Sequence, residues 1–254
     1  MYPGHVRHLP IDRSTLLTEE VPFELAENLA AYRSNKAVAE YSFYRLFPQE
    51  DYLFRKYYRA GESVLDLACG LGRTTLLLYE MGLTVRGVDC SDVFIQVAKR
   101  RLPYLDLRLG SYDHIDEPDA SYSHVLISFN GIDYAFPESQ RTAALRECAR
   151  VLKPGGTLIF SSHNLKSLHL FSPYDRERLG WKLRNSIRAF KDWDYVIEND
   201  VHTYYASPAL VVRQTEEAGL RLLERKGFSK IKFDRLDIYF SPYIHYVFQK
   251  PPVD

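Results

Sequence analysis

The sequence has little cysteine, and the cysteines present follow no known pairing or metal-binding pattern. Cys69, Cys90 and Cys148 are the three in 254 residues, and no CxxC spacing occurs. An odd number without that spacing predicts neither a disulfide framework nor a zinc site, so we expect no bound metal. A reducing, cytoplasmic setting is the simplest interpretation.

Long hydrophobic runs are also missing. Residues 1–14 lack the apolar stretch of a secretory signal peptide. No segment approaches the roughly 18 consecutive apolar residues that a transmembrane helix requires. We therefore expect neither a cleaved leader nor a membrane span.

The chain has no excess of either charge. Lys and Arg number 33, Asp and Glu also number 33, and the formal net charge is zero. Proteins dedicated to nucleic acids usually carry a basic excess, so a nucleic-acid partner is disfavoured. Hydrophobic residues make up 46% of the sequence, which suffices for a substantial core. The length fits one large α/β domain with an insertion.

Strands and helices are expected to alternate in the middle of the chain. Residues 23–58 show helical spacing and form part of an N-terminal helical extension, residues 1–58, ahead of a main domain over 59–254. Within that domain, short apolar runs alternate with helical patterns, which is typical of a doubly wound, mostly parallel sheet. The expected strands cover residues 63–69, 84–90, 105–113, 123–130 and 157–164, and the expected helices cover 73–82, 91–102 and 139–156.

The alternation stops after Asn164. Residues 207–227 have the spacing of a long helix, and residues 228–240 and 245–250 look like an antiparallel pair of strands at one sheet edge. The fold class predicted is therefore α/β, with a seven-stranded sheet whose last strand is antiparallel. The segment of about 165–206, between strand five and the last helix, is expected to form a lid over the substrate.

The strongest local pattern runs from Val64 to Gly72. A strand ends, the chain turns on Gly70 and Gly72, and a helix begins, so the backbone can approach a ligand closely. Asp89 ends the next strand, where an acidic side chain can accept hydrogen bonds from both hydroxyls of a ribose. Together the two features indicate a cofactor that contains a nucleoside.

These residues resemble motif I of the class I methyltransferases, which use S-adenosylmethionine (SAM). Thr75 stands where a dinucleotide-binding fingerprint has Gly or Ala, and Asp66 precedes the first glycine by four residues. The resemblance extends over about residues 60–163 and includes a characteristic segment at 150–156. It implies a Rossmann-like fold, SAM as cofactor and S-adenosylhomocysteine as product. The residues it places around the cofactor are Asp66, Ala68, Cys69, Gly70, Gly72, Asp89, Cys90, Ser111, Tyr112, Asp113, Phe129 and Asn130.

Two positions depart from the family pattern. Ala68 replaces the first glycine of the usual Gly-x-Gly-x-Gly, and Ser111 replaces a common Asp beside the adenine. Adenine recognition could therefore fall to Asp113 or to backbone groups. Simpler structural roles remain open for three acids, since Asp66 could cap the turn, Asp89 could flank the next helix and Asp113 could be an ordinary loop residue.

Catalytic candidates come from the ends of strands four and five, where ligands bind in such sheets. Asp133 could hydrogen-bond the substrate and Tyr134 could pack on it. His163 is the first choice for a general base, because histidine side chains ordinarily titrate near neutrality. A purely structural histidine is the alternative. His202 and Tyr204-Tyr205 could line the same pocket.

Two further groups could contribute to the substrate site. The first consists of aromatic residues of the helical extension and the lid, which could wall a cavity for a flat or sugar-like substrate or simply pack the added helices. The second is a basic cluster that suits either an anionic substrate or a solvated helix face. The aromatic group is Tyr32, Tyr41, Tyr44, Trp181, Trp193 and Tyr195, and the basic group is Arg176, Arg178, Lys182, Arg184, Arg188 and Lys191.

The leading hypothesis is a methyltransferase for an oxygen or nitrogen atom of a small molecule. The alternatives are a methyltransferase for RNA or protein, a SAM-binding protein without catalytic activity and, from another class, an NAD-dependent oxidoreductase. The sequence does not name the acceptor or the oligomeric state.

Overall fold

The computed structural model describes residues 32–42, 45–135, 137–167, 194–198, 202–227 and 239–252. Seven strands form one sheet in the order β3-β2-β1-β4-β5-β9-β8. All neighbours are parallel except β9, which is antiparallel to β5 and to β8. The strands are β1 (Ser63–Leu67), β2 (Thr84–Asp89), β3 (Asp106–Leu109), β4 (Tyr122–Ile127), β5 (Leu152–His163), β8 (Arg221–Gly227) and β9 (Tyr243–Gln249).

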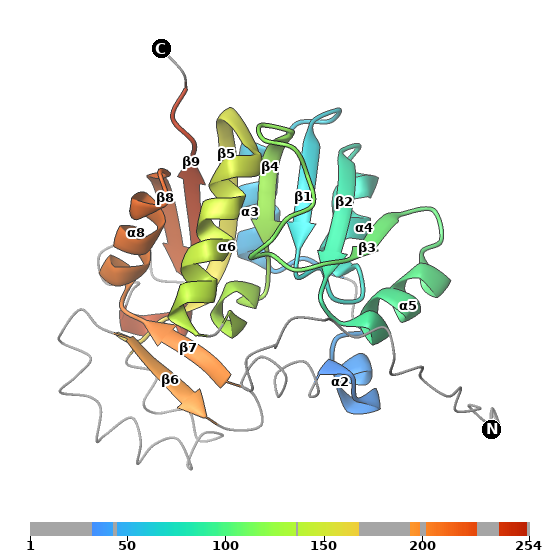
Figure 1. The fold of residues 1–254 in the computed structure, drawn as a ribbon, viewed down its shortest axis with the longest axis horizontal. Coiled ribbons are helices and arrows are strands. Elements are labelled where there is room, and N and C mark those ends of the chain that lie inside the picture. Colours follow the sequence, from blue (N-terminus) through green and yellow to red (C-terminus); the bar gives the residue numbers. More distant parts are fainter. Residues whose placement is uncertain are drawn as a thin grey trace.

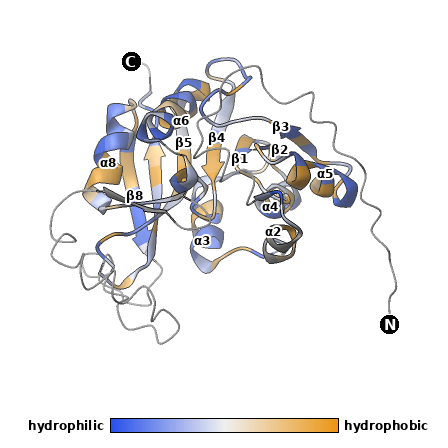
Figure 2. Cartoon of the chain, turned by 60° about the horizontal axis from the view of Figure 1, so that its bottom comes forward, coloured by the Kyte–Doolittle hydropathy of each residue, from blue (hydrophilic) through white to orange (hydrophobic). Residues whose placement is uncertain are grey.

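Helices cover both faces of this sheet (Figure 1). Helices α6 and α8 lie in front in that view, and α3 and α4 lie behind. Helices α5 and α8 show hydrophobic residues on one side and hydrophilic residues on the other (Figure 2). Their bounds are α2 (Asn35–Glu40), α3 (Pro48–Tyr57), α4 (Arg73–Glu80), α5 (Asp92–Arg101), α6 (Glu138–Val151) and α8 (Pro208–Glu217), with a 3₁₀ turn, η2, at Gly131–Tyr134.

The side chains of each central strand alternate between two core layers. Leu65 and Leu67 of β1 belong to the layer beneath α6 and α8, whereas Val64 belongs to the layer beneath α3. All three are fully buried. Because parallel strands buried on both faces need hydrophobic residues throughout, this arrangement accounts for the short apolar runs of the sequence. The predicted doubly wound, mostly parallel seven-stranded sheet with an antiparallel last strand is confirmed.

One expectation about the last third of the chain was wrong, and another falls almost entirely outside the described residues. Residues 207–227 are not one helix, because α8 ends at Glu217 and Gly219 takes a left-handed conformation, with φ of 90°. Residues from Arg221 on then form β8, whose partner is β9. The edge pair is antiparallel as predicted, but its strands are β8 and β9; residues 228–238 lie outside the described residues.

Proline and glycine mark the ends of two of these helices. Helix α3 begins at Pro48, in the first-turn position that proline tolerates. Helix α6 ends at Val151, ahead of the Pro-Gly-Gly segment, and β5 begins at once. No helix in the described ranges is long and apolar enough to cross a bilayer.

Two elements lie beyond the carboxyl ends of the parallel strands (Figure 1). Helix α2 lies on the side of β2 and α5, and a hairpin of β6 (Asp194–Glu198) and β7 (His202–Ala206) lies on the side of α8. Leu165 N donates to Ala206 O, at 3.0 Å, which ties β7 to the end of β5. Because the strand order changes direction between β1 and β4, the ends of these strands are where a ligand site is expected.

Candidate functional site

The turn after β1 depends on left-handed backbone conformations. Ala68, Gly70 and Gly72 have φ of 52°, 57° and 82°. Ala68 holds this conformation although it carries a Cβ. If residue 131 were alanine instead of glycine, its Cβ would lie only 2.9 Å from Ala68 Cβ. The two loops therefore contact each other closely only because position 131 is glycine.

Asp66 lies beneath this turn. Its Oδ2 accepts hydrogen bonds from the hydroxyls of Thr74 and Thr75, at 2.8 and 2.7 Å. Among the described residues, its Oδ1 has no hydrogen-bond partner. Burial raises the pKa of the Asp66 carboxyl to about 6, while the two threonine hydroxyls act in the opposite direction. Asp66 thus stabilises the turn through Oδ2, and its buried Oδ1 can accept a further hydrogen bond.

Asp89 ends β2 and faces the same turn. Its two oxygens accept hydrogen bonds from Gly70 N and Ser91 N, each at 2.8 Å. Burial raises the pKa of Asp89, against the two backbone N–H groups that lower it. A carboxylate has about four lone-pair positions, so two remain for a ligand.

A hollow of about 700 Å³, its open mouth included, lies over these residues. Its wall is largely aromatic, and the ring centroids of Tyr32 and Tyr134 lie 5.6 Å apart, edge to face. Burial is the main cause that raises the pKa of Tyr32 and of Tyr134. The lining includes Tyr32, Tyr41, Ala68, Cys69, Gly70, Asp89, Cys90, Phe94, Tyr112, Phe129, Gly131 and Tyr134.

The predicted cofactor residues separate into two groups. Ala68, Cys69, Gly70, Asp89, Cys90, Tyr112 and Phe129 line the hollow, and Tyr134 from the catalytic candidates joins them. Asp66, Gly72, Ser111, Asp113 and Asn130 do not. Gly72 directly precedes α4 as its N-cap, and a Cβ there would meet Leu102 and Leu107 instead of a ligand.

Ser111 and Asp113 bond to each other beside the hollow. The Ser111 hydroxyl donates to Asp113 Oδ1, and Gln140 Nε2 donates to Asp113 Oδ2 at 3.0 Å. Of this stretch, only Tyr112, between them, lines the hollow. The geometry therefore presents the Tyr112 ring, with the two polar neighbours holding the loop.

An ion pair that sequence reasoning missed lies at the edge of the hollow. Arg73, the first residue of α4, makes two bonds to Glu50 of α3, at 2.7 and 2.8 Å, and both side chains are buried. Arg73 also donates to Ser128 Oγ at 3.2 Å and lies over the ring of Phe47 at 5.3 Å. This pair fastens the N-terminal helix α3 to the ends of β1 and β4.

The chain turns sharply again after β4. Phe129 and Asn130 are both left-handed, with φ of 52° and 60°. Asn130 N donates to Ser161 Oγ of β5 at 2.8 Å. Strained backbone of this kind is held by its surroundings, and here it brings η2 against the end of β5.

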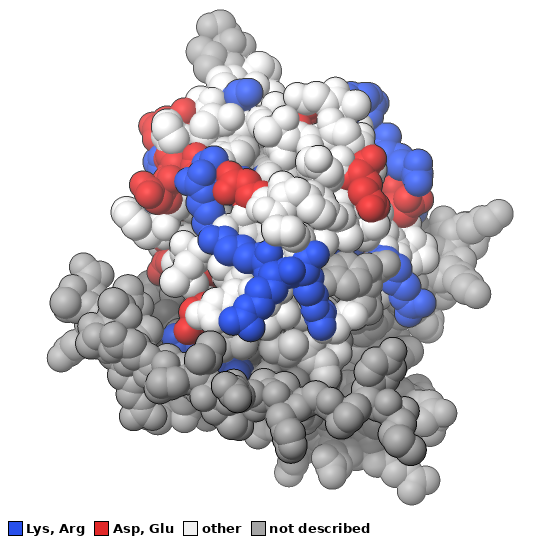
Figure 3. Space-filling model, turned by 90° about the vertical axis from the view of Figure 1, so that its right-hand side faces the viewer, with Lys and Arg blue, Asp and Glu red and all other residues white. Residues whose placement is uncertain are grey.

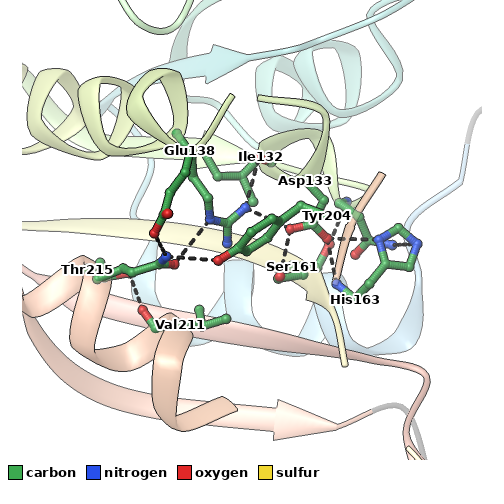
Figure 4. Close-up of polar contacts among 12 residues, drawn as sticks. Ile132, Asp133, Glu138, Ser161, His163, Tyr204, Val211 and Thr215 are labelled. Carbon is green, nitrogen blue, oxygen red and sulfur yellow. Dashed lines mark hydrogen bonds and ion pairs between the residues drawn. The ribbon is translucent and has the colours of Figure 1, made fainter. Parts of the chain in front are cut away.

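The catalytic candidates Asp133 and His163 meet at this point. Asp133 is fully buried, and His163 Nδ1 lies 2.8 Å from its Oδ2 (Figure 4). The ring of His163 packs against Tyr205 of β7, with centroids 4.6 Å apart. Neither Asp133 nor His163 lines the hollow, so Asp133 does not face a substrate there, contrary to the role the sequence suggested for it.

Other candidates are only partly described. Trp181, Trp193, Tyr44 and the basic cluster of residues 176–191 lie outside the described residues, as do the side chains of Tyr195 and His202. Within the described parts of the chain, no group of three or more His, Cys, Asp or Glu could hold a metal ion. Tyr204, by contrast, is buried and lies over the Arg141 guanidinium at 4.5 Å.

The fold resembles that of solved methyltransferase structures. A SAM-dependent methyltransferase from Methanosarcina mazei superposes with a TM-score of 0.63 at 15% identity, over 82% of this chain and 99% of that one. At that identity the likeness shows the Rossmann-like fold. The model of the methyltransferase domain family matches residues 64–156, which span β1 to the start of β5.

Relatives in sequence carry the same assignment. A probable S-adenosylmethionine-dependent methyltransferase from Mycolicibacterium smegmatis is 32% identical over 46% of this chain and 47% of its own length. A ubiquinone biosynthesis O-methyltransferase from Thiobacillus denitrificans is 26% identical over 67% of this chain and 69% of its own. The chain therefore spans about half the length of the first relative and about two thirds of the second. Over residues 64–156 the chain is similar to the methyltransferase domain family, and these relatives are named as methyltransferases.

Proposed function

We propose that the protein transfers a methyl group from SAM to an oxygen or nitrogen atom of a small-molecule acceptor. The observation that carries this proposal is the Asp89 carboxylate at the hollow. It shares the site with the glycine turn and keeps two lone-pair positions for ribose hydroxyls. The apolar ring of Tyr112 provides a surface for the adenine.

The residues present fit the cofactor in two further respects. The tight contact of Ala68 with Gly131 keeps side chains out of the space between the two loops. The buried Asp66 Oδ1, which has no partner among the described residues, suits a donor such as the amino group at the methionine end or a water molecule that bridges to it. Once bound, SAM supplies a methyl group already activated on a sulfonium. The protein's task is then mainly to orient the acceptor and exclude water.

The wall of the hollow supports a small acceptor. Tyr32, Tyr41, Phe94, Phe129 and Tyr134 line it with rings, which favours a flat, largely apolar molecule. The relative from Thiobacillus denitrificans is named for O-methyl transfer in ubiquinone biosynthesis, which points in the same direction. Cys69, Cys90 and Cys148 are free thiols, in keeping with the cytoplasmic setting we propose.

The alternative acceptor, a nucleic acid or a protein, would favour an unbroken basic surface, and the face seen in Figure 3 is of mixed charge. A group of Lys and Arg side chains lies on the side of α5 and β3, but acidic side chains lie on either side of it (Figure 3). Lys99, Arg100 and Arg101 end α5, where positive charge complements the helix dipole. An oxidoreductase is disfavoured by Thr75, whose hydroxyl bonds Asp66 where a dinucleotide site has a small residue.

The test is calorimetric titration with S-adenosylhomocysteine. Wild-type protein should bind it saturably, and Asp89→Ala should weaken binding about 10- to 100-fold, because each hydrogen bond to a charged group is worth about 1.5–3 kcal/mol. Asp119→Ala is the matched control. Asp119 is exposed and lies just before the amino end of β4, whereas Asp89 lies at the carboxyl end of β2. Its substitution should leave binding unchanged.

The result that would sink the cofactor assignment is a folded wild-type protein, checked by circular dichroism, that does not bind. Binding of NADH by that protein would then favour the oxidoreductase. Methyl transfer from radiolabelled SAM to panels of hydroxyl and amine acceptors would follow a positive result.

A further inference from the structure

Asp133 is the centre of a buried hydrogen-bond network that the proposed cofactor site does not use. Its Oδ1 accepts from Arg141 Nη1 at 2.9 Å and from Ser162 Oγ at 2.7 Å. Its Oδ2 accepts from His163 N at 2.6 Å and lies 2.8 Å from His163 Nδ1. The network joins η2, α6 and the end of β5 (Figure 4).

This network fixes which nitrogen of His163 carries the proton. Arg141, whose side chain is 1% exposed, is always protonated and holds Asp133 as its carboxylate. A carboxylate only accepts hydrogen bonds, so the His163 Nδ1 that faces Oδ2 must be the donor. In the neutral ring Nε2 is then the acceptor, which is the form that a general base requires.

The other ring nitrogen, Nε2, lies beside the loop that borders the ligand hollow. His163 Nε2 lies 3.5 Å from Asn130 Nδ2, and the neighbours of Asn130 on each side, Phe129 and Gly131, both line the hollow. The His163 side chain is 18% exposed while Asp133 is fully buried, so of the two only the histidine is accessible from outside the network.

Strand β7 of the hairpin inserted after β5 covers the network from outside. The ring of Tyr204 lies 4.5 Å from the Arg141 guanidinium, and Tyr204 Oη accepts from Gln214 Nε2 at 2.9 Å (Figure 4). The ring of Tyr205 packs on the His163 imidazole. Two successive residues of one strand thus cover the cation and the imidazole on either side of Asp133.

We propose that Asp133 is a positioning residue that holds His163 with its proton on Nδ1, and that the acceptor is an O–H or N–H nucleophile. This inference rests on the proposed function. As the acceptor atom bonds to the methyl carbon, the methyl–sulfur bond breaks with its electron pair left on sulfur, and the acceptor proton moves to Nε2. The imidazolium that forms is stabilised by the Asp133 carboxylate.

The position of the proton can be measured directly by ¹⁵N NMR of the imidazole rings, without an acceptor. At mildly alkaline pH, His163 should show a protonated Nδ1 and an unprotonated Nε2, and His163→Gln assigns its signals. His124 is an internal control of the opposite kind. Its Nε2 faces the Glu62 carboxylate at 2.9 Å and its Nδ1 faces Thr157 Oγ1 at 2.8 Å, so its proton should lie on Nε2.

Two variants test the role of Asp133. In Asp133→Asn the amide oxygen is drawn to Arg141 and Ser162, so the amide NH₂ faces His163 and the ring proton should move to Nε2. Ser162→Ala removes one donor from Asp133 but leaves its bonds to the histidine, and should leave the proton on Nδ1.

A wild-type spectrum with the proton of His163 on Nε2 would overturn the proposal, and so would an Asp133→Asn variant whose ring proton stays on Nδ1. If Asp133→Asn does not fold, the wild-type spectrum still decides. Titration of the wild type with S-adenosylhomocysteine is independent of this result, since a correct tautomer without binding would refute the proposed function and not the network.

Discussion

The contact between Ala68 and Gly131 leads to a prediction about how the two ligand-facing loops fit together. Gly131→Ala would place a Cβ 2.9 Å from Ala68 Cβ, closer than real Cβ atoms approach their neighbours, and 3.0 Å from Ile127 Cγ2, which is also crowded. Gly131 is not among the residues with positive φ, so the cost comes from crowding alone. Overpacking of this kind costs about 1–3 kcal/mol.

The partner residue makes the prediction specific. Ala68→Gly removes the atom responsible for the closest contact, and on its own should change the free energy of unfolding by less than about 1 kcal/mol, since glycine relieves the left-handed φ but loosens the unfolded chain. In the double variant only the Ile127 contact remains, so most of the loss should be recovered. The coupling between the two sites should reach about 1–2 kcal/mol.

Urea unfolding followed by circular dichroism measures all four proteins of this cycle. Calorimetry with S-adenosylhomocysteine adds a second readout, because crowding should push the loops apart and weaken binding in Gly131→Ala and restore it in the double variant. Additive effects, with no recovery in the double variant, would refute the claim that the two loops are in direct contact.

The remaining predictions concern buried charge. Glu50→Ala leaves Arg73 buried without its partner and should lower the free energy of unfolding by about 3–5 kcal/mol in urea, whereas Asp51→Ala, which breaks an exposed pair, should cost less than about 1 kcal/mol; equal effects would contradict the buried pair. Because the folded pKa of Asp66 is raised to about 6, the wild type should gain stability relative to Asp66→Asn as pH falls from about 7 to 4, by about 2–3 kcal/mol, and a pH-independent difference would disprove the shift.

The parts of the site that could be predicted from sequence are those encoded within a few residues. A strand, a glycine turn and a helix N-terminus follow one another from Val64 to Arg73, and Asp89 ends the next strand. Parallel topology then brings both ends to one edge of the sheet. Local order and topology therefore suffice to place Gly70 beside Asp89, with no knowledge of side-chain packing.

The helix expected at 207–227 shows where a local pattern is ambiguous. Leu220, Leu222 and Leu223 continue the apolar spacing of α8, so the spacing outweighed Gly219, a residue that commonly ends helices. The backbone at Gly219 ends it, and pairing with β9 makes the following residues a strand whose side chains alternate in exposure. Strand propensity here comes from the tertiary partner.

The network around His163 could not have been predicted, because its members come from separate elements. Asp133 appeared to be a substrate-facing acid because it follows a strand end, yet Arg141, one helix further on, turns it into a buried anion. Nothing in the spacing of residues 133, 141 and 163 states that one carboxylate will face both. Their meeting depends on η2 folding back against β5, which the left-handed pair Phe129-Asn130 makes possible.

The inserted hairpin contacts both the candidate base and the arginine that bonds Asp133. Tyr204 and Tyr205 pack on the Arg141 and His163 side chains at the two ends of the network, whereas the glycine turn and Asp89 belong to the main sheet. The loop after β4 contributes to both sites, because Phe129 and Gly131 line the hollow while Asp133 holds His163. Because Tyr204 and Tyr205 pack on the network, we expect substitutions there to change proton acceptance more than binding of the proposed cofactor.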